Sequence, residues 1–298
     1  MKLNHLRDLL AVVERGSIRA AAKHLGTTQP ALSRSIRELE KDIGVPLIER
    51  RAKGAVLTPS GTLFVRRASA AMNELRRGRE EIEQLHGAVH GTVVVCLSSL
   101  SNVELLPAVL VPFRKRYPLV RLRIIEGVYP LVETRLRDGT VDFYVGPAPQ
   151  GGLPSDLVSE KLFDNTRIVL ARKGHPLGSA KCLAELTDAE WITTAITEKA
   201  ETEFSDLFAS HNLPTPHLAI QADSGLTWIV ALANSDMLAI SPRQWAGVPL
   251  VHGLFQQIRI KESLAGPSIV LVQRAAIPLT PASEHLCDLL RRTARHIS

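Results

Sequence analysis

The sequence contains little of what holds secreted or membrane proteins together. Its three cysteines, Cys96, Cys182 and Cys287, are odd in number and far apart, which supports neither a disulfide framework nor a metal cluster. We interpret all three as buried thiols. No apolar run approaches the roughly 18 residues that span a bilayer. The N-terminal segment carries Arg7 and Asp8 where a signal peptide would be apolar, so we expect a cytoplasmic protein.

Motifs of catalysis and of cofactor binding are also missing. The chain has no Walker loop, no GxGxxG motif, no GxSxG nucleophile elbow and no HExxH zinc motif. His175 stands in the segment GHPL without a paired carboxylate, and a turn is the simpler interpretation of that segment. We therefore predict a protein that is not an enzyme and that holds no metal or cofactor.

Positive charge is present, but only in one part of the chain. Residues 1–90 contain 16 Lys and Arg against 10 Asp and Glu, whereas residues 91–298 contain 20 basic and 20 acidic residues. The net charge of +6 therefore belongs to the first third of the sequence. A basic surplus confined to one small module is typical of a surface that binds nucleic-acid phosphates.

Three short helices are predicted at the N-terminus, over residues 3–14, over residues 18–25 and from about residue 29 to residue 43. Ser17 and Thr28 are suited to cap the second and third helices, while Gly26 and Gly44 end them. One apolar face of the third helix repeats at spacings of four, three and four residues, through Leu32, Ile36, Leu39 and Ile43. This order of helices, with a glycine turn between the last two, is typical of a helix-turn-helix.

Two short strands and a long helix follow. The strands are expected around residues 47–48 and 56–57, with a basic turn at Lys53 and Gly54, so they predict a wing. The helix, over about residues 60–86, carries an apolar seam at alternating spacings of four and three, formed by Phe64, Ala68, Ala71, Leu75, Gly78, Ile82 and Leu85. Its outer face is charged, through Arg76, Arg77, Arg79, Glu80 and Glu81. Such a seam favours packing against a second helix, so we predict dimerisation here.

From residue 92 onward the pattern alternates between strands and helices, which predicts an α/β fold with parallel sheet and two lobes around a cleft. We expect strands at residues 92–99, 120–127, 141–147, 167–172, 191–195, 218–222, 237–241 and 268–274. Helices are expected at residues 103–116, 130–138, 201–210, 225–233 and 281–296. The predicted domains are a DNA-binding domain over residues 1–59, a linker over 60–90 and an effector domain over 91–298. Lobe I takes about residues 91–163 and 268–298, and lobe II about 164–267.

The third helix is the predicted reader of DNA. Gln29 is suited to bond adenine, and Arg34 and Arg37 are suited to reach guanine or phosphate. The full set of predicted DNA contacts adds backbone and wing positions, namely Thr28, Pro30, Ser33, Arg51 and Lys53. The alternative for each residue is an ordinary solvated helix face, because Arg and Gln favour helices anyway. The combination of capped helix, turn, basic reader and basic wing favours DNA.

These residues resemble the N-terminus of the LysR-type transcriptional regulators. The resemblance rests on a run of marker positions, namely Ala21, Ala22, Leu25, Thr28, Gln29, Pro30, Ala31, Leu32, Ser33, Leu39, Glu40, Gly44, Pro46, Leu47, Gly54, Leu57, Thr58, Pro59, Ser60 and Gly61. It continues through residues 105–127, 136–147, 169–177 and 183–191, which resemble the effector domain of that family. Residues 127–143 and 277–283 are most similar to the regulator of p-toluenesulfonate degradation.

The resemblance implies an architecture and a mode of action. It implies a winged helix-turn-helix, a dimerising linker helix and two Rossmann-like lobes of periplasmic-binding-protein type. Such proteins usually bind promoter DNA as tetramers and respond to a small inducer in the cleft. The sequence does not tell activation from repression, nor does it identify the inducer.

Candidate inducer contacts lie where helices begin after strands, at Ser98, Ser99, Ser101, Asn102, Thr193, Thr194 and Ser224. Tyr129 stands where many members of the family carry Ser or Thr, and its ring is expected to reshape the site. The alternative for every Ser and Thr is helix capping. Neutral donors of this kind suit a small aromatic carboxylate or sulfonate. Trp228 is suited to stack on such a ring or, more simply, to fill the core.

Two other functions compete with regulation. The C-terminal module alone is similar to a solute-binding protein, but the predicted DNA module argues against that. An architectural DNA protein with a vestigial sensor is the second alternative, and retained DNA binding without any ligand response would identify it.

Overall fold

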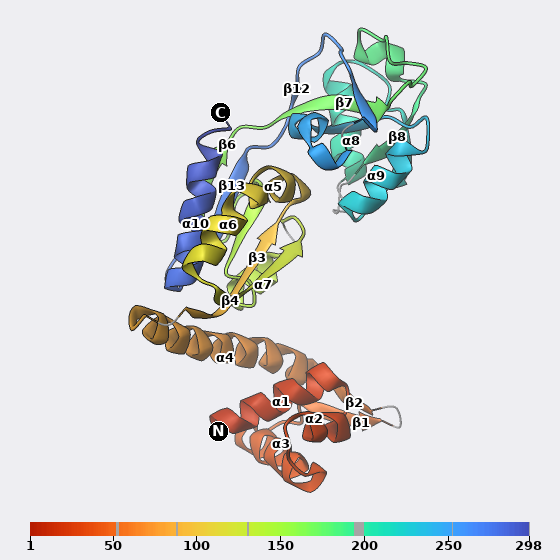
Figure 1. Ribbon diagram of the computed structural model, residues 1–298. Helices are drawn as coiled ribbons and strands as arrows, with labels where there is room; N and C mark the ends of the chain where they lie inside the picture. Colours follow the sequence, from red (N-terminus) through yellow and green to blue (C-terminus); the bar gives the residue numbers. More distant parts are fainter. Residues whose placement is uncertain (52–53, 88, 130, 194–199, 252, 298) are drawn as a thin grey trace. The chain divides into compact units, whose positions relative to one another are not determined.

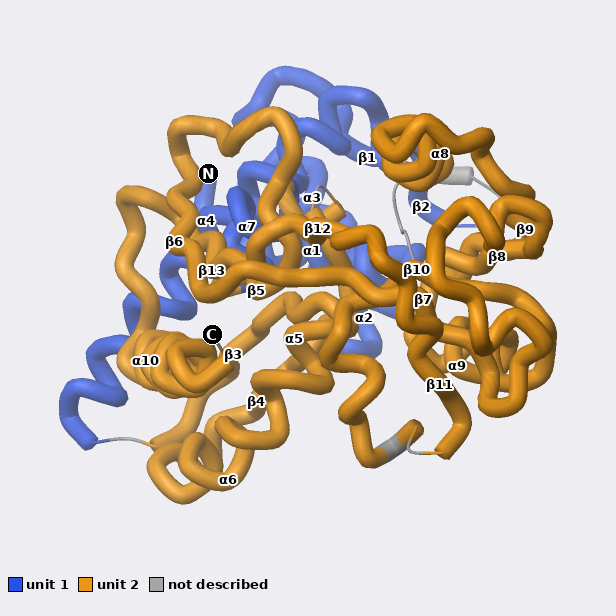
Figure 2. The backbone as a smooth tube through the Cα atoms, turned by 90° about the horizontal axis from the view of Figure 1, so that it is seen from above, with its two compact units in different colours: residues 1–88, 134–141 blue, residues 89–133, 142–298 orange. Residues whose placement is uncertain are grey.

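A computed structural model describes residues 1–51, 54–87, 89–129, 131–193, 200–251 and 253–297. The chain divides into two compact units (Figures 1 and 2). The first consists of residues 1–88 and 134–141, and the second of residues 89–133 and 142–298. Each unit has its own hydrophobic core.

The first unit is built on three helices, α1 (Leu3–Arg15), α2 (Ile18–His24) and α3 (Gln29–Ile43). The predicted caps are confirmed, since the Ser17 hydroxyl accepts from the Ala20 N–H at 3.2 Å and the Thr28 hydroxyl from the Ala31 N–H at 3.3 Å. Gly44 ends α3 in the left-handed conformation, with a φ of 87°. The apolar face of α3 is buried at Leu32, Ile36 and Leu39, but Ile43 is exposed, so the predicted face is one turn too long.

A two-stranded wing and a long helix complete this unit. Strands β1 (Ile48–Arg51) and β2 (Gly54–Leu57) pair antiparallel, and α4 runs over Pro59–Leu85. Thr58 joins them, because its hydroxyl accepts from the Gly61 N–H at 2.9 Å and donates to the Pro46 carbonyl at 2.8 Å. The wing is thereby tied to the start of α4. Of the predicted turn, Lys53 lies outside the described residues.

The second unit begins with a five-stranded sheet in the order β4-β3-β5-β13-β6. Its strands are β3 (His90–Leu97), β4 (Leu119–Glu126), β5 (Phe143–Pro147), β6 (Leu157–Phe163) and β13 (Ile269–Arg274). The predicted parallel pairing is confirmed for β4, β3 and β5, whereas β13 runs antiparallel to both its neighbours. Helices α5 (Ser99–Glu104), α6 (Leu106–Arg116) and α10 (Pro281–Ala294) belong to this unit, whereas α7 (Glu133–Arg137) lies in the first unit from its second residue onward. Helices α6 and α10 lie side by side (Figure 1), and their buried side chains share one hydrophobic cluster with the strands of this sheet.

A second group of strands is centred on β7 (Thr166–Arg172). Antiparallel to it run β10 (Ala239–Pro242), β11 (Phe255–Ile258) and β12 (Leu264–Ala265), while β8 (Glu190–Thr193) and β9 (His217–Gln221) form a parallel pair. The parallel sheet predicted here is therefore wrong for β7 and its neighbours. Helices α8 (Ala200–Ser210) and α9 (Gly225–Ala233) and the 3-10 helices η1 (Leu183–Leu186), η2 (Arg243–Gly247) and η3 (Pro249–Val251) complete this group. The two sheets define a first and a second lobe.

The chain passes twice between the lobes, once in each direction. Residues 164–165 lead from β6 to β7, and residues 266–268 lead from β12 back to β13. The two passages are bonded side by side, since the Gly266 N–H donates to the Asn165 carbonyl at 3.0 Å and the Ser268 hydroxyl donates to Asp164 at 2.7 Å. The two segments that connect the lobes therefore lie next to each other in the structure.

The cysteines are only partly as predicted. Cys96 and Cys287 are buried, and burial raises the pKa of the Cys287 thiol well above its usual value. Cys182 is partly exposed, and its thiol donates to the Glu185 carboxylate at 3.1 Å, so the prediction of a third buried thiol is wrong. No helix in the described part of the chain is long and apolar enough to cross a membrane.

Candidate functional site

Helix α3 has an exposed polar face that does not pack against the rest of its unit. Its apolar side chains pack into the core with α1 and α2. Four residues predicted to contact DNA, Gln29, Pro30, Arg34 and Arg37, are exposed on this helix, and Thr28 is exposed at its cap. The structure therefore brings five of the eight predicted DNA contacts together at one helix.

The acidic residues of α3 are occupied by the fold, whereas its arginines are not. The Glu40 carboxylate accepts from the Leu47 and Ile48 N–H groups at 2.8 and 3.1 Å, which anchors the start of the wing. Glu38 lies 3.4 Å from the His5 ring on α1. Within the described residues, Arg34 and Arg37 have neither an ion pair nor a hydrogen bond. Arg34 and Arg37 therefore present positive charge on the exposed part of this helix without a carboxylate partner of their own among the described residues.

The other three predicted DNA contacts are placed differently. Ser33 is buried, with 8% of its surface exposed, so its hydroxyl offers little to a ligand. Arg51 ends strand β1, and Lys53 lies outside the described residues.

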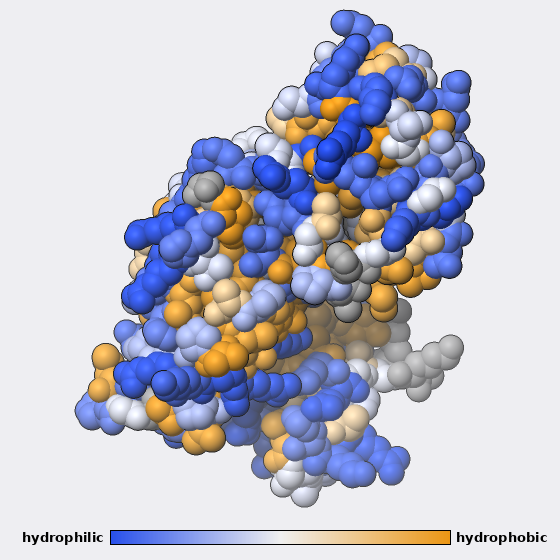
Figure 3. Space-filling model, turned by 45° about the horizontal axis from the view of Figure 1, so that its top comes forward, coloured by the Kyte–Doolittle hydropathy of each residue, from blue (hydrophilic) through white to orange (hydrophobic). Residues whose placement is uncertain are grey.

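The predicted seam of helix α4 is buried at its start and exposed further along the helix. Ala68 is buried in the core of the first unit. Along the predicted seam Leu75 is 53% exposed, Ile82 is 60% exposed, and Leu85 is also exposed. Figure 3 shows that the face of the molecule it presents carries apolar patches among mainly hydrophilic side chains. An exposed row of large apolar side chains on a 27-residue helix is a surface suited to a partner helix.

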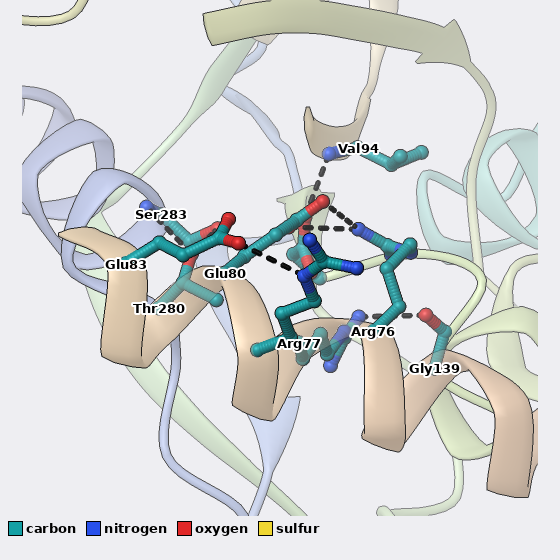
Figure 4. A network of polar contacts seen from close by, with 10 residues as sticks. Arg76, Arg77, Glu80, Glu83, Val94, Gly139, Thr280 and Ser283 are labelled. Atoms are coloured by element: carbon teal, nitrogen blue, oxygen red, sulfur yellow. Dashed lines mark hydrogen bonds and ion pairs between the residues drawn. The ribbon is translucent and has the colours of Figure 1, made fainter. Parts of the chain in front are cut away.

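One residue of α4 was assigned to the wrong face by the sequence. Arg77, predicted to lie on the charged outer face, is buried, and its guanidinium donates to the Gly139 carbonyl at 2.7 Å (Figure 4). Asn73, one turn earlier, donates to the Asp138 carbonyl at 3.2 Å. Both contacts lie within the first unit, which includes residues 134–141. The heptad pattern does not show this, because the partner segment is more than 60 positions away in the sequence.

At the start of α5 the predicted inducer contacts form a helix cap. The Ser98 hydroxyl accepts from the Ser101 N–H at 3.2 Å and lies 3.0 Å from the Ser101 hydroxyl. Both side chains are buried. The capping alternative therefore accounts for these two residues, while the Ser99 hydroxyl, partly exposed, has no partner in the described part of the chain.

Most of the remaining predicted hydroxyls are also occupied. Ser224 caps α9 by accepting from the Thr227 N–H at 3.2 Å. The Tyr129 hydroxyl donates to Glu133 at 2.8 Å. Thr193 ends β8 and is partly exposed, and Thr194 lies outside the described residues. Trp228 is 1% exposed and packs against Trp245 with ring centroids 5.2 Å apart, which confirms its role in the core.

The structure adds three polar residues that the sequence did not single out as a group. Glu126, at the end of β4, is exposed and has no hydrogen bond or ion pair among the described residues. The Asn102 Oδ1 on α5 and the Gln244 Oε1 on η2 are buried without a hydrogen-bond partner, and these two elements pack together. Asn102 was predicted as an inducer contact, but Glu126 and Gln244 were not. Only the position of Glu126 after a strand pointed to it.

Comparison with known proteins identifies both parts of the chain. Residues 3–62 match the family described as bacterial regulatory helix-turn-helix protein, lysR family, and residues 86–295 match the LysR substrate binding domain. The chain is 28% identical over 288 residues to the HTH-type transcriptional regulator GalR of Pseudomonas putida, across 96% of this chain and 72% of that protein. It is 26% identical over 290 residues to the regulator TdcA of Escherichia coli, across 97% of this chain and 92% of that protein.

Solved structures share the fold. CbnR, a LysR family transcriptional regulator, superposes with a TM-score of 0.74 at 20% identity, covering 99% of both chains. Full-length CbnR complexed with its target DNA gives a TM-score of 0.72 at 18% identity, covering 98% of this chain and 100% of that one. At such identities the likeness concerns the fold: a helix-turn-helix module followed by a two-lobed α/β module.

Proposed function

Because the chain belongs to the LysR family of transcriptional regulators, we propose that α3 reads promoter DNA and that a small inducer bound between the two lobes changes this binding. DNA binding and transcriptional regulation follow from the family, and the relatives it matches are regulators and not enzymes. The particular residues, the assembly and the inducer are our proposal. We also propose the domain boundaries given above, with the DNA-binding domain over residues 1–59, the linker over 60–90 and the effector domain over 91–298.

The observation that carries the DNA-reading surface is the pair Arg34 and Arg37. Both are exposed on α3 and lack a carboxylate partner, while Glu38 and Glu40 of the same helix are engaged with α1 and the wing. A guanidinium without a local partner is available to phosphate or to the O6 and N7 atoms of guanine. We propose that Gln29, at the first turn of α3, contacts adenine and that Thr28 and Pro30 contact the DNA backbone. Arg51 and Lys53 of the wing are proposed to contact phosphates.

Self-association is proposed through residues 60–86. The exposed Leu75, Ile82 and Leu85 form the apolar surface that a second α4 would cover. A dimer then presents two α3 helices to two half-sites of the operator. Association of two dimers into a tetramer, acting on nucleoid DNA in the cytoplasm, completes the proposed assembly.

The inducer site is proposed between the lobes, near Ser99 and Ser224. The sequence predicts an aromatic carboxylate or sulfonate, as for the subgroup of p-toluenesulfonate regulators. Support for an aromatic stacking partner is weak, because Trp228 is buried in the core. The predicted negative charge of the inducer depends on free hydroxyls at the site, but the hydroxyls of Ser98 and Ser224 serve as helix caps.

The test is a gel-shift titration of the full chain on the intergenic DNA upstream of its own gene, at fixed salt and against a scrambled competitor. Specific binding that Arg34→Ala weakens, and that Arg292→Ala leaves unchanged, supports the proposal. Arg292 is an exposed arginine of the second unit and matches the charge change. Equal binding to both DNAs would reject α3 as a sequence reader.

A further inference from the structure

The start of helix α9, in the second lobe, lies directly against the first lobe. A Cβ atom placed on Gly225, the first residue of α9, would stand 3.4 Å from the Glu126 Oε1 and 3.9 Å from the Ser99 Cβ. It would also stand 3.9 Å from the Trp245 Cη2. A lobe I carboxylate therefore lies close to the first turn of a lobe II helix.

The position of Glu126 matters because of the helix it faces. The N-terminal end of an α-helix carries a partial positive charge and is the usual place to bind an anion. At α9 that place already has a carboxylate of the chain beside it, without a cationic partner among the described residues. A second carboxylate or a sulfonate at this point would meet a like charge.

The neighbouring polar atoms are acceptors as well. The Asn102 Oδ1 on α5 and the Gln244 Oε1 on η2 are buried and unpartnered, and η2 also carries the Trp245 that contacts Gly225. Val103, next to Asn102, packs against the hydrophobic cluster of the second lobe. These residues therefore belong to the same contact between lobes. We call the group Ser99, Asn102, Glu126, Gly225 and Gln244 the interlobe site.

Three serine hydroxyls near the interlobe site are used within the fold: those of Ser98 and Ser101 bond each other, and that of Ser224 lies 2.8 Å from the Thr227 hydroxyl. The Ser99 hydroxyl has no partner among the described residues. An unpartnered buried acceptor costs free energy that a donor restores. The two amide oxygens therefore offer acceptors to a ligand, and the Glu126 carboxylate adds a negative charge.

We propose that the inducer of this regulator carries a protonated amine, and that Glu126 is the residue that selects it. The inference rests on the proposed function, since it assigns a charge to the inducer of that same site. An ammonium group carries a positive charge and three N–H donors, which suits a carboxylate with unpartnered amide oxygens on neighbouring elements. This charge replaces the aromatic acid that the hydroxyl-rich sequence predicts.

The experiment compares two probes of equal size and opposite charge, benzylamine and benzoate, on the full chain. Tryptophan fluorescence reports binding, because Trp191, Trp228 and Trp245 all lie in the second unit. The variants are Glu126→Gln, which removes the charge and keeps the shape, and Glu201→Gln, which removes an exposed charge on α8 as a matched control. We expect benzylamine to bind wild type more tightly than benzoate. Glu126→Gln should weaken benzylamine by roughly tenfold or more, as for the loss of a charge-assisted hydrogen bond, and Glu201→Gln should not.

A further variant, Gly225→Leu, places a bulky side chain between Ser99, Glu126 and Trp245 and should abolish binding of the amine. Gly225→Val is the smaller blocking form if the leucine variant does not fold. Three results would overturn the proposal: preference of wild type for benzoate, an unchanged probe ratio in Glu126→Gln, or no response to the amine. The gel shift without probe is run on the same samples. Benzoate binding that Gly225→Leu abolishes keeps the interlobe site and rejects only the charge. Loss of specific DNA binding in wild type rejects the proposed function itself.

Discussion

The two units of this protein differ in the polar groups that their own folds leave unpaired. In the first unit the carboxylates of α3 are bound into the fold, and the exposed arginines are left for an anionic partner. In the second unit the hydroxyls of Ser98 and Ser224 are bound into helix caps, whereas at the interlobe site the Glu126 carboxylate and two amide oxygens have no partner among the described residues. A fold satisfies its own polar groups first, so the groups that remain unpaired indicate the charge of the ligand. The predictions below test whether each unit behaves as this contrast requires.

The largest effect is expected from charging the exposed seam of α4 with the double variant Leu75→Asp, Ile82→Asp. If the seam joins two copies, four large side chains per dimer lose their apolar contact, on the order of 6 kcal/mol. Sedimentation should show a monomer, and specific DNA binding should fall because two half-sites are no longer read together. Val111→Asp is the control, since Val111 is 76% exposed on α6 in the other unit. A double variant that remains dimeric would exclude the seam as the interface.

A smaller effect, on one unit only, is expected from Gly61→Ala. A Cβ on Gly61 would collide with the Leu47 carbonyl oxygen, which belongs to the backbone and has little room to move. Overpacking of this kind costs about 3 kcal/mol. Thermal unfolding followed by circular dichroism should show a destabilised helical transition. The tryptophan signal, which arises only from the second unit, should keep its midpoint.

Gly225→Ala is the matched control for Gly61→Ala. The nearest neighbours of its added Cβ stand 3.4 to 3.9 Å away, which is ordinary van der Waals contact, so the stability of the second unit should hardly change. If Gly61→Ala and Gly225→Ala destabilise the protein equally, the collision with the Leu47 carbonyl is not the cause of the effect at Gly61.

The two units also differ in how much of their structure could be predicted from the sequence. In the first unit the signals are local: Ser17, Thr28 and Gly44 act on residues within one helical turn, and all three were predicted correctly. Arg77 was assigned to the wrong face because its partner, Gly139, is distant in the sequence. Local patterns predict elements well and contacts between distant segments poorly.

In the second unit the decisive pairings are distant. Strands β6, β11 and β12 were not predicted, because short strands with mixed polarity resemble loops in a single sequence. The antiparallel partners of β7 come from residues 239–265, so neither direction nor order was visible locally. For the candidate site the sequence found hydroxyls at the right strand ends, but it could not show that Ser98 and Ser101 bond each other. It also could not place Glu126 beside Gly225.

On helix α3, which we propose to read DNA, Arg34→Ala should weaken specific DNA binding by about 2 kcal/mol if the guanidinium contacts a base. The expected signature is a smaller ratio of operator to scrambled affinity at an unchanged slope of binding against salt. Arg37→Ala provides the comparison on the same face of α3. A change in slope with an unchanged ratio would instead assign Arg34 to a phosphate.

The smallest effect is expected at Glu40, where the carboxylate serves the fold and not the ligand. Glu40→Gln keeps an oxygen that accepts from Leu47 and Ile48 but removes its charge, so the first unit should lose about 1 kcal/mol. Glu40→Ala leaves both N–H groups without that acceptor and should lose more. Because Glu40 lies on the same helix as Arg34, a rise in DNA affinity in Glu40→Gln would show that its negative charge opposes binding. Unchanged affinity, with the stability loss seen by circular dichroism, is the result we expect, since two backbone N–H groups of the wing bind this carboxylate.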